Sequence, residues 1–311
     1  MKFVIFGTGG VGGYFGGKLA QAGEDVTFIA RGEHLKAIQQ NGLRVDSISG
    51  DFVIKPAKAT DNPAEVSAVD VIFVCTKAWS VPKAIEQMRP LIGGRAFAVW
   101  LGNGIEPTDQ LEKAFGRKHV IGGLTHISSF IVGPGHIQHV GITPHIAIGE
   151  LDRTHSARVE DLLKIFERIP EINADSPDDI RLAIWQKFAF IAATSGVGAL
   201  TRQPMGVYRS VPETRAMLLA ALEEVVKIGR ARGIAFNDVA AQEILANEID
   251  PKPASVIASM QKAIMEGKPS ELEAQTGTVV RLGRELGIPT LTHDFIYAAL
   301  LPMELKARGK L

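Results

Sequence analysis

A glycine-rich turn near the start of the chain constrains the fold most strongly. The stretch FGTGGVGG contains the pattern Gly7-x-Gly9-x-x-Gly12 between an apolar run and a helix-like segment. In this strand–turn–helix context the pattern is typical of the first βαβ unit of a Rossmann fold. Gly7 would form the tight turn, Gly9 would let a pyrophosphate approach the backbone, and Gly12 would allow close helix–strand packing. Gly10 and Val11 would open the helix whose N-terminus attracts the phosphate charge. The alternative is a glycine-rich turn without a ligand.

The first half of the chain alternates strand-like and helix-like segments. Such alternation predicts an α/β domain with a parallel sheet that is covered on both faces. The region 119–150 differs, because strand-like residues flank a Gly-Pro-Gly turn at 133–135 and therefore predict an antiparallel pair. The buried strands expected before this region are 2–7, 25–30, 70–76 and 97–102.

From about residue 176 onward, the apolar spacing becomes helical. Ser176 is a candidate helix cap, and Pro177 with two following aspartates suits a first helical turn. We therefore expect a Rossmann domain over residues 1–175 and an all-helical domain over residues 176–311.

Composition excludes several classes of protein. Lys plus Arg and Asp plus Glu both number 34, and this balance disfavours nucleic acid or a membrane surface as the main partner. A single cysteine, Cys75, excludes an internal disulfide and is compatible with a reducing cytoplasm, and its apolar neighbours predict a core position. The N-terminus is expected to be a strand rather than a signal peptide. His136 and His139 are three apart in a strand-like segment, so they form a poor metal pair.

The residue after the second expected strand bears on the choice of cofactor. A carboxylate at this place would bind a ribose hydroxyl of NAD, whereas the sequence has Arg31. A guanidinium suits a 2′-phosphate, so the pattern favours NADPH/NADP. The alternative is that Arg31 is a solvated loop residue and that Glu33 holds the ribose.

Two further polar residues follow expected strands at the sheet edge where ligands bind in such folds. Lys77, in VCTKAWS, would lie near cofactor or substrate, or would simply be a surface lysine that opens a helix. Asn103, in WLGNGIEP, stands between two glycines that would let a ligand approach. Its alternative is an asparagine in a left-handed turn.

In the helical half, Lys187 stands within the apolar run RLAIWQKFAFIAATSGVGAL. A buried ammonium group is costly unless it is paired or can release its proton, although a lysine on the wet side of a helix is the simpler interpretation. Ser259 and Glu271 are further candidates, and each alone is most simply a helix cap or a surface group.

Taken in order, Gly7-x-Gly9-x-x-Gly12, Lys77-Ala-Trp, Asn103-Gly, Trp185-x-Lys187 and Ser270-Glu271 resemble the ketopantoate reductases (2-dehydropantoate 2-reductases). The resemblance covers essentially the whole chain. It implies a Rossmann domain that holds NADPH and a helical domain that closes over the substrate.

The resemblance also implies roles for individual residues. Lys187 matches the catalytic lysine, and Glu271 matches the acidic residue that engages the substrate and positions the lysine. Asn103 and Ser259 match substrate contacts, Lys77 matches a residue near cofactor and substrate, and Arg31 matches the residue expected at the 2′-phosphate. Asn103 and Glu271 would also contact the cofactor.

The chain departs from the family pattern after the catalytic lysine. Where many members carry asparagines, four and eight residues on, this chain has Ile191 and Ser195. The departure leaves the reaction type intact and puts the identity of the 2-oxo acid in question.

The resulting expectation is an NADPH-dependent reduction of 2-dehydropantoate to pantoate, for pantothenate and coenzyme A synthesis, with Lys187 as general acid. Alternatives are a reductase of another 2-oxo acid and an NADPH-binding regulatory protein without turnover. A β-hydroxyacid dehydrogenase is a weaker alternative, because the residues after Lys187 lack the usual glycine signature of that class. A small-molecule substrate is the expected partner, and the apolar helix faces are compatible with a homodimer.

Overall fold

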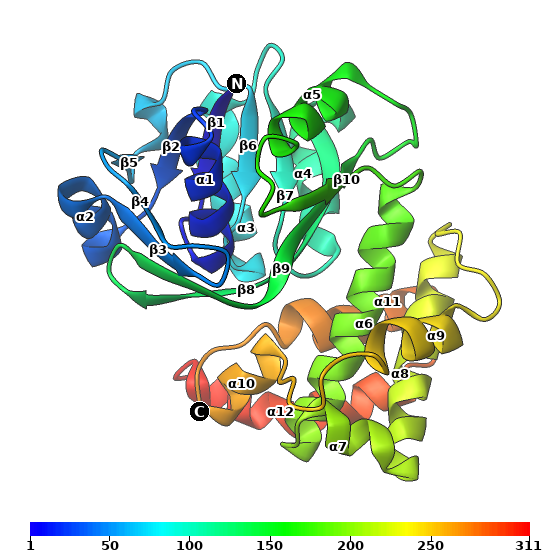
Figure 1. Cartoon of the computed structure of the whole chain (residues 1–311). Coiled ribbons are helices and arrows are strands. Elements are labelled where there is room, and N and C mark those ends of the chain that lie inside the picture. Colours follow the sequence, from blue (N-terminus) through cyan, green and yellow to red (C-terminus); the bar gives the residue numbers. More distant parts are fainter. The chain divides into compact units, whose positions relative to one another are not determined.

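The computed structural model describes residues 1–311, and the chain divides into two compact units (Figure 1). The first unit contains residues 1–102 and 107–180, and the second contains residues 103–106 and 181–311. The short segment 103–106 therefore belongs with the C-terminal helices, although it lies between two segments of the first unit.

The first unit is built on a ten-stranded mixed sheet. Its strands are β1 (Lys2–Phe6), β2 (Asp25–Ile29), β3 (Leu43–Ser47), β4 (Phe52–Ile54), β5 (Lys58–Thr60), β6 (Val71–Val74), β7 (Phe97–Trp100), β8 (Val120–Gly133), β9 (His136–Gly149) and β10 (Asn173–Asp175). The order is β4-β3-β9-β8-β7-β6-β1-β2-β5, and β10 pairs with β9. β1, β2, β6 and β7 are parallel neighbours, and β8 pairs antiparallel with β9, as the sequence predicts.

Helices alternate with the parallel strands of this unit. They are α1 (Gly10–Gln21), α2 (Gly32–Asn41), α3 (Val81–Met88), α4 (Glu106–Phe115) and α5 (Ala157–Phe166), with 3₁₀ turns η1 (Pro63–Glu65), η2 (Ala78–Ser80), η3 (Arg89–Leu91) and η4 (Arg117–His119). Only the first residue of α4 is assigned to the second unit.

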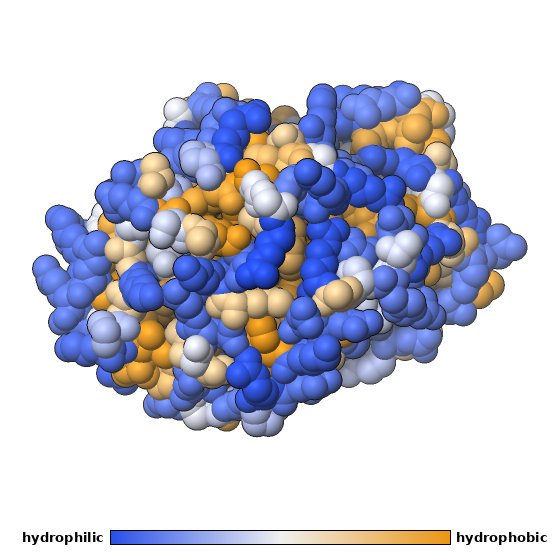
Figure 2. All heavy atoms as spheres, turned by 90° about the horizontal axis from the view of Figure 1, so that it is seen from above, coloured by the Kyte–Doolittle hydropathy of each residue, from blue (hydrophilic) through white to orange (hydrophobic).

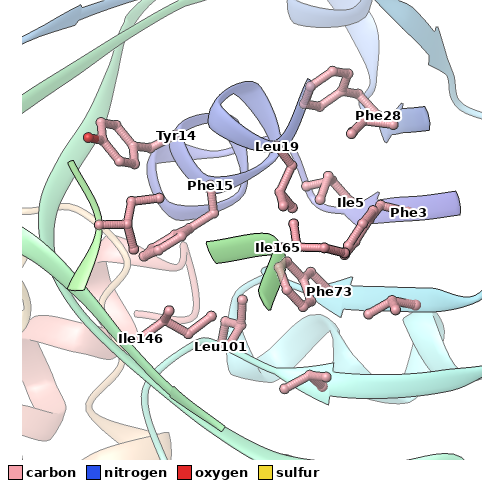
Figure 3. Close-up of a cluster of buried hydrophobic side chains, with 14 of the residues drawn as sticks. Phe3, Ile5, Tyr14, Phe15, Leu19, Phe28, Phe73, Leu101, Ile146 and Ile165 are labelled. Carbon is pink, nitrogen blue, oxygen red and sulfur yellow. The ribbon is translucent and has the colours of Figure 1, made fainter. Parts of the chain in front are cut away.

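The core of the first unit lies between α1 and the sheet (Figure 3). Phe15 and Leu19 of α1 are fully buried, and Figure 3 shows Leu19 beside Ile5 of β1. Farther along, Phe73 of β6 stacks on Phe166 of α5 with their ring centroids 6.3 Å apart. Burial of such aromatic and branched side chains supplies the main driving force for folding of the unit.

The second unit is entirely helical, as expected. Its helices are α6 (Ile180–Thr201), α7 (Met205–Ser210), α8 (Pro212–Ala231), α9 (Ala240–Glu243), α10 (Ser259–Met265), α11 (Thr278–Leu286) and α12 (Leu291–Ala307), with two π-helical segments, η5 (Ile244–Ile249) and η6 (Glu273–Gly277). Most of α6 between Ile184 and Ala199 is buried, which explains its nearly continuous apolar sequence.

The predicted start of α6 is wrong. Ser176–Asp178 precede the helix instead of forming its cap and first turn, because residues 173–175 pair with β9 as strand β10. The chain needs these residues to pass from the strand to the helix. Asp179, directly before the helix, forms an ion pair with Arg153 at 2.7 Å.

The helix α10 covers only part of the segment 253–267, although the apolar spacing of this whole segment is helical. Only Ser259–Met265 is α-helical, and the residues from Pro253 to Ala258 form turns and irregular backbone.

Polar residues dominate the face shown in Figure 2, and apolar residues form separate patches on it. None of the helices is long and apolar enough to cross a membrane.

Candidate functional site

The glycine turn of the first unit has backbone geometry that side chains would prevent. Gly7 has φ +104°, and the amides of Gly7 and Thr8 donate to the carbonyl oxygen of Ile29 at 3.3 and 3.2 Å. A Cβ atom on Gly12 would lie 2.2 Å from the carbonyl oxygen of Gly7 and 2.8 Å from a methyl group of Ile5. The turn and the packing of α1 against β1 therefore both require glycine.

Gly9 and Gly10 differ in what surrounds them. A Cβ atom on Gly10 would lie 2.2 Å from the carbonyl oxygen of Ser129 in β8, so this glycine permits a close approach within the protein. Around Gly9, the residue that precedes α1, no atom lies within 4 Å of a would-be Cβ. Val11 is partly buried and packs against the core. The helix N-terminus is thus open at Gly9, and such an end can hold an anionic group.

Arg31 lies beyond the end of β2, where it directly precedes α2. Its side chain is exposed, and its guanidinium donates to Oε1 of Gln87 at 2.6 Å. Glu33 is also exposed and pairs with Lys36 at 2.8 Å. Arg31 is therefore accessible to a 2′-phosphate, and Glu33 is equally accessible to a ribose hydroxyl.

Lys77 follows β6 and precedes the 3₁₀ turn Ala78–Ser80. Its side chain is exposed, and its Nζ atom lies 6.0 Å from the ring centroid of Trp79. This lysine thus stands at the carboxyl edge of the parallel strands, where the sequence places it.

In the second unit, Lys187 lies partly buried on α6. Burial lowers the pKa of Lys187 to about 8, and the negative charge of Glu271 opposes this shift. The ammonium form consequently predominates at neutral pH and loses its proton far more readily than that of an exposed lysine. A group with these properties can act as a general acid.

Glu271 is 5% exposed and lies two residues before the π-helical segment η6. Its Oε2 atom accepts a hydrogen bond of 3.4 Å from the side-chain amide of Asn103. Asn103 does not adopt the left-handed conformation, since the positive φ of this turn, +95°, is taken by Gly104. The second unit therefore brings together three residues named from the sequence, Lys187, Glu271 and Asn103.

A second polar contact holds the segment 103–106 on the helical unit. Glu106 accepts hydrogen bonds from Arg281 at 2.7 Å and from the hydroxyl of Thr278 at 2.9 Å. Sequence analysis did not identify Glu106, and the only signal for it is its position three residues after Asn103.

Three other residues named in the sequence analysis also lie in the second unit. Ser259 is the first residue of α10 and is exposed, and its predicted substrate contact stays a prediction. Ile191 is partly buried, whereas Ser195 is 3% exposed. Both follow Lys187 along α6.

The two histidines named in the sequence analysis and the single cysteine make contacts within the first unit that explain their positions. Both ring nitrogens of His139 are engaged, by the hydroxyl of Ser47 and the carbonyl oxygen of Ile142, each at 2.8 Å. His136 pairs with Asp46 at 2.8 Å. Cys75 packs against the core, and burial raises the pKa of its thiol.

Sequence reasoning also missed Gln275, which lies in η6 and is 1% exposed. Neither its side-chain nitrogen nor its oxygen has a hydrogen-bond partner. The signal available in the sequence was an amide at a helical position otherwise suited to an apolar residue.

Comparison with known proteins finds family models that match most of the chain. The family model "Ketopantoate reductase PanE/ApbA" matches residues 3–153, and the model for its C-terminal part matches residues 179–304. The 2-dehydropantoate 2-reductase of Mesorhizobium japonicum is 30% identical over 322 residues, covering 96% of each chain.

Solved structures show the same similarity. A PanE/ApbA family ketopantoate reductase from Ralstonia eutropha superposes with a TM-score of 0.87 at 29% identity, covering 99% of this chain and 100% of that one. A D-mandelate dehydrogenase, solved with NADH and anilino(oxo)acetate, has a TM-score of 0.86 at 22% identity over 99% of each chain. The latter likeness concerns the fold alone.

Proposed function

Because the chain belongs to the ketopantoate reductase PanE/ApbA family, a family of dinucleotide-binding oxidoreductases, we propose that it reduces 2-dehydropantoate to pantoate with NADPH. The observation that carries the proposal is the group formed by Lys187, Glu271 and Asn103 in the helical unit. We place the reaction in the cytoplasm, as a step toward pantothenate and coenzyme A.

Residues of the first unit fit the cofactor. Gly7, Gly9 and Gly12 shape the turn before α1, and the open space at Gly9 suits the pyrophosphate. Arg31 provides a guanidinium for the 2′-phosphate, and Lys77 stands at the same strand edge. When bound, NADPH supplies the hydride for the reduction.

Residues of the second unit stabilise and neutralise the negative charge that develops on the substrate's carbonyl oxygen. Lys187 stabilises this charge as a hydrogen-bond donor and delivers a proton to the oxygen, which becomes the new hydroxyl. Its pKa of about 8 makes this transfer easier than it is from an ordinary lysine. Glu271 keeps the lysine protonated, and Asn103 orients the Glu271 carboxylate.

A second candidate function is reduction of a different 2-oxo acid. The apolar side chain of Ile191, one turn after Lys187 on α6, favours it, because an apolar residue there suits a bulkier hydrocarbon portion. A panel of branched 2-oxo acids distinguishes the two functions. Binding of NADPH without oxidation by any 2-oxo acid would instead indicate a regulatory protein.

The deciding experiment follows NADPH absorbance with 2-dehydropantoate and runs NADH in parallel. We expect rapid oxidation of NADPH and little oxidation of NADH. Arg31→Ala should lower the preference for NADPH about 10- to 100-fold, since hydrogen bonds to charged groups contribute about 1.5–3 kcal/mol.

Arg89 provides a matched control for this substitution. It is an exposed arginine of the same unit, paired with Glu86 at 3.1 Å. Arg89→Ala should leave the coenzyme preference unchanged. An unchanged preference in Arg31→Ala as well would exclude Arg31 from the 2′-phosphate site.

A further inference from the structure

Gln275 has a buried side-chain amide whose hydrogen-bonding capacity is entirely unused within the protein. Burying such an amide without partners carries a free-energy cost. Gln261, 0% exposed in the same unit, shows the usual solution. Its amide nitrogen donates to the carbonyl oxygen of Gln203 at 2.8 Å, and its oxygen accepts from the amide of Ala258 at 3.4 Å.

The position of Gln275 links it to the reacting groups. Its backbone amide donates to the carbonyl oxygen of Glu271 at 3.0 Å, so the two residues lie one helical turn apart. Side chains four apart project from the same side of a helix. The turn is π-helical, with a bond of 2.9 Å from the amide of Gly277 to the carbonyl oxygen of Leu272. Widened turns of this kind occur frequently at functional sites.

The next residue connects this turn to the helix that carries Lys187. Thr276 is fully buried, and its hydroxyl also lacks a partner. This hydroxyl lies 3.7 Å from the position of a Cβ atom on Gly196 of α6. The turn that carries Gln275 therefore packs against α6 at Gly196.

We propose that Gln275 is a specificity-determining residue whose amide hydrogen-bonds a hydroxyl group of the 2-oxo acid, remote from the reacting carbonyl. A side-chain amide both donates and accepts, and a hydroxyl does the same, so the two groups are complementary. The inference rests on the proposed reductase function and deepens it. According to this inference, the preferred substrates are 2-oxo acids that carry a terminal hydroxyl, as 2-dehydropantoate does.

The test compares 2-dehydropantoate with 3,3-dimethyl-2-oxobutanoate, which lacks only the terminal hydroxyl. Gln275→Leu should lower kcat/KM for the hydroxylated acid about five- to tenfold, mainly through KM, because one neutral hydrogen bond is lost. The kcat/KM for 3,3-dimethyl-2-oxobutanoate should stay unchanged or rise. An unchanged ratio between the two acids overturns the proposal.

Thermal unfolding separates this role from a structural one. Gln275→Leu should leave Tm unchanged or raise it, since it removes an unpartnered amide. The control Gln261→Leu should lower Tm and leave the ratio of the two acids unchanged. If Gln275→Leu fails to fold, Gln275→Met retains nearly the same length without the amide and is judged by the same ratio.

A third measurement keeps the two proposals apart. Absence of turnover of both acids by the unaltered protein contradicts the reductase proposal, and binding is then followed as the rise in Tm in the presence of NADPH. Greater stabilisation by the hydroxylated acid, lost in Gln275→Leu, supports the role of Gln275. Equal stabilisation by the two acids, or none, overturns it.

Discussion

At position 187 an ammonium group stands on a helix whose neighbouring residues are mostly apolar and buried. Burial lowers the pKa of Lys187, and the Glu271 carboxylate limits the decrease. These opposing influences leave the lysine protonated at neutral pH but ready to release its proton. A surface lysine would be charged equally well and would transfer its proton much less readily.

Replacing Lys187 tests whether the proton comes from this residue. Lys187→Ala should reduce kcat about 10²- to 10⁴-fold, the usual contribution of general acid catalysis, and leave the Kd for NADPH nearly unchanged. Lys227, an exposed lysine of α8, provides the control, and Lys227→Ala should retain full activity. Equal kcat values for Lys187→Ala and the unaltered protein would remove the lysine from the mechanism.

The pH dependence tests the influence of Glu271. A general acid works only while protonated, so kcat/KM should fall as the pH rises through about 8, the pKa of Lys187. Glu271→Gln removes the charge that raises this pKa, so the decline should begin at a lower pH. The measurement is the pH profile of kcat/KM for both proteins. An identical alkaline limb would show that the two residues are not coupled.

At the scale of the element, the glycines at the start of α1 have two different roles. Two of them allow close packing, and one leaves open space beside the helix. A Cβ atom would collide with the protein at Gly10 and Gly12, whereas nothing lies near Gly9. The same short motif thus combines glycines that packing requires with one that leaves space open before α1.

Two alanine substitutions separate these constraints. Gly12→Ala should lower the free energy of unfolding by about 1–3 kcal/mol or more, because its Cβ meets backbone and core atoms. Gly9→Ala should leave Tm nearly unchanged and weaken NADPH binding at least about tenfold, because its Cβ enters the space for the pyrophosphate. Thermal unfolding and NADPH titration check both variants. Equal losses of Tm would contradict the distinction.

Local patterns predict the parallel strands, the β8–β9 hairpin and most of the long helices, because apolar periodicity and turn glycines act over short distances. They do not predict contacts between distant segments. His293 pairs with Glu224 at 2.6 Å across 69 residues, and neither residue has a local signal for this contact.

The same limit applies to the candidate site. Lys187 is conspicuous in its apolar run, and Asn103 is a candidate because it follows an expected strand between two glycines. Glu271 alone is most simply a cap or a surface group, and only the family resemblance gives it a role. For Gln275 the sequence offers only an amide at a helical position suited to an apolar residue, because the lack of hydrogen-bond partners is revealed only when the surrounding atoms are placed.

At the scale of the whole molecule, the chain order and the compact units do not coincide. Residues 103–106 interrupt the first unit in sequence and belong to the second. Their contacts explain the assignment, since Asn103 bonds to Glu271 and Glu106 bonds to Arg281. The helical unit thus contains one four-residue piece that residues 107–180 separate from the rest of the unit along the chain.

This arrangement determines which segments should be exchanged together in chimaeras between this protein and its relatives. A hybrid that exchanges only residues 181–311 would join foreign helices to the parental Asn103 and Glu106. We expect a higher Tm and higher kcat when residues 103–106 are exchanged together with the helices than when they are left behind. Equal values for the two hybrids would show that the four-residue segment is interchangeable. Recombination breakpoints in this chain are therefore best judged by spatial unit, because a single cut near residue 180 separates residues 103–106 from the helices that they contact.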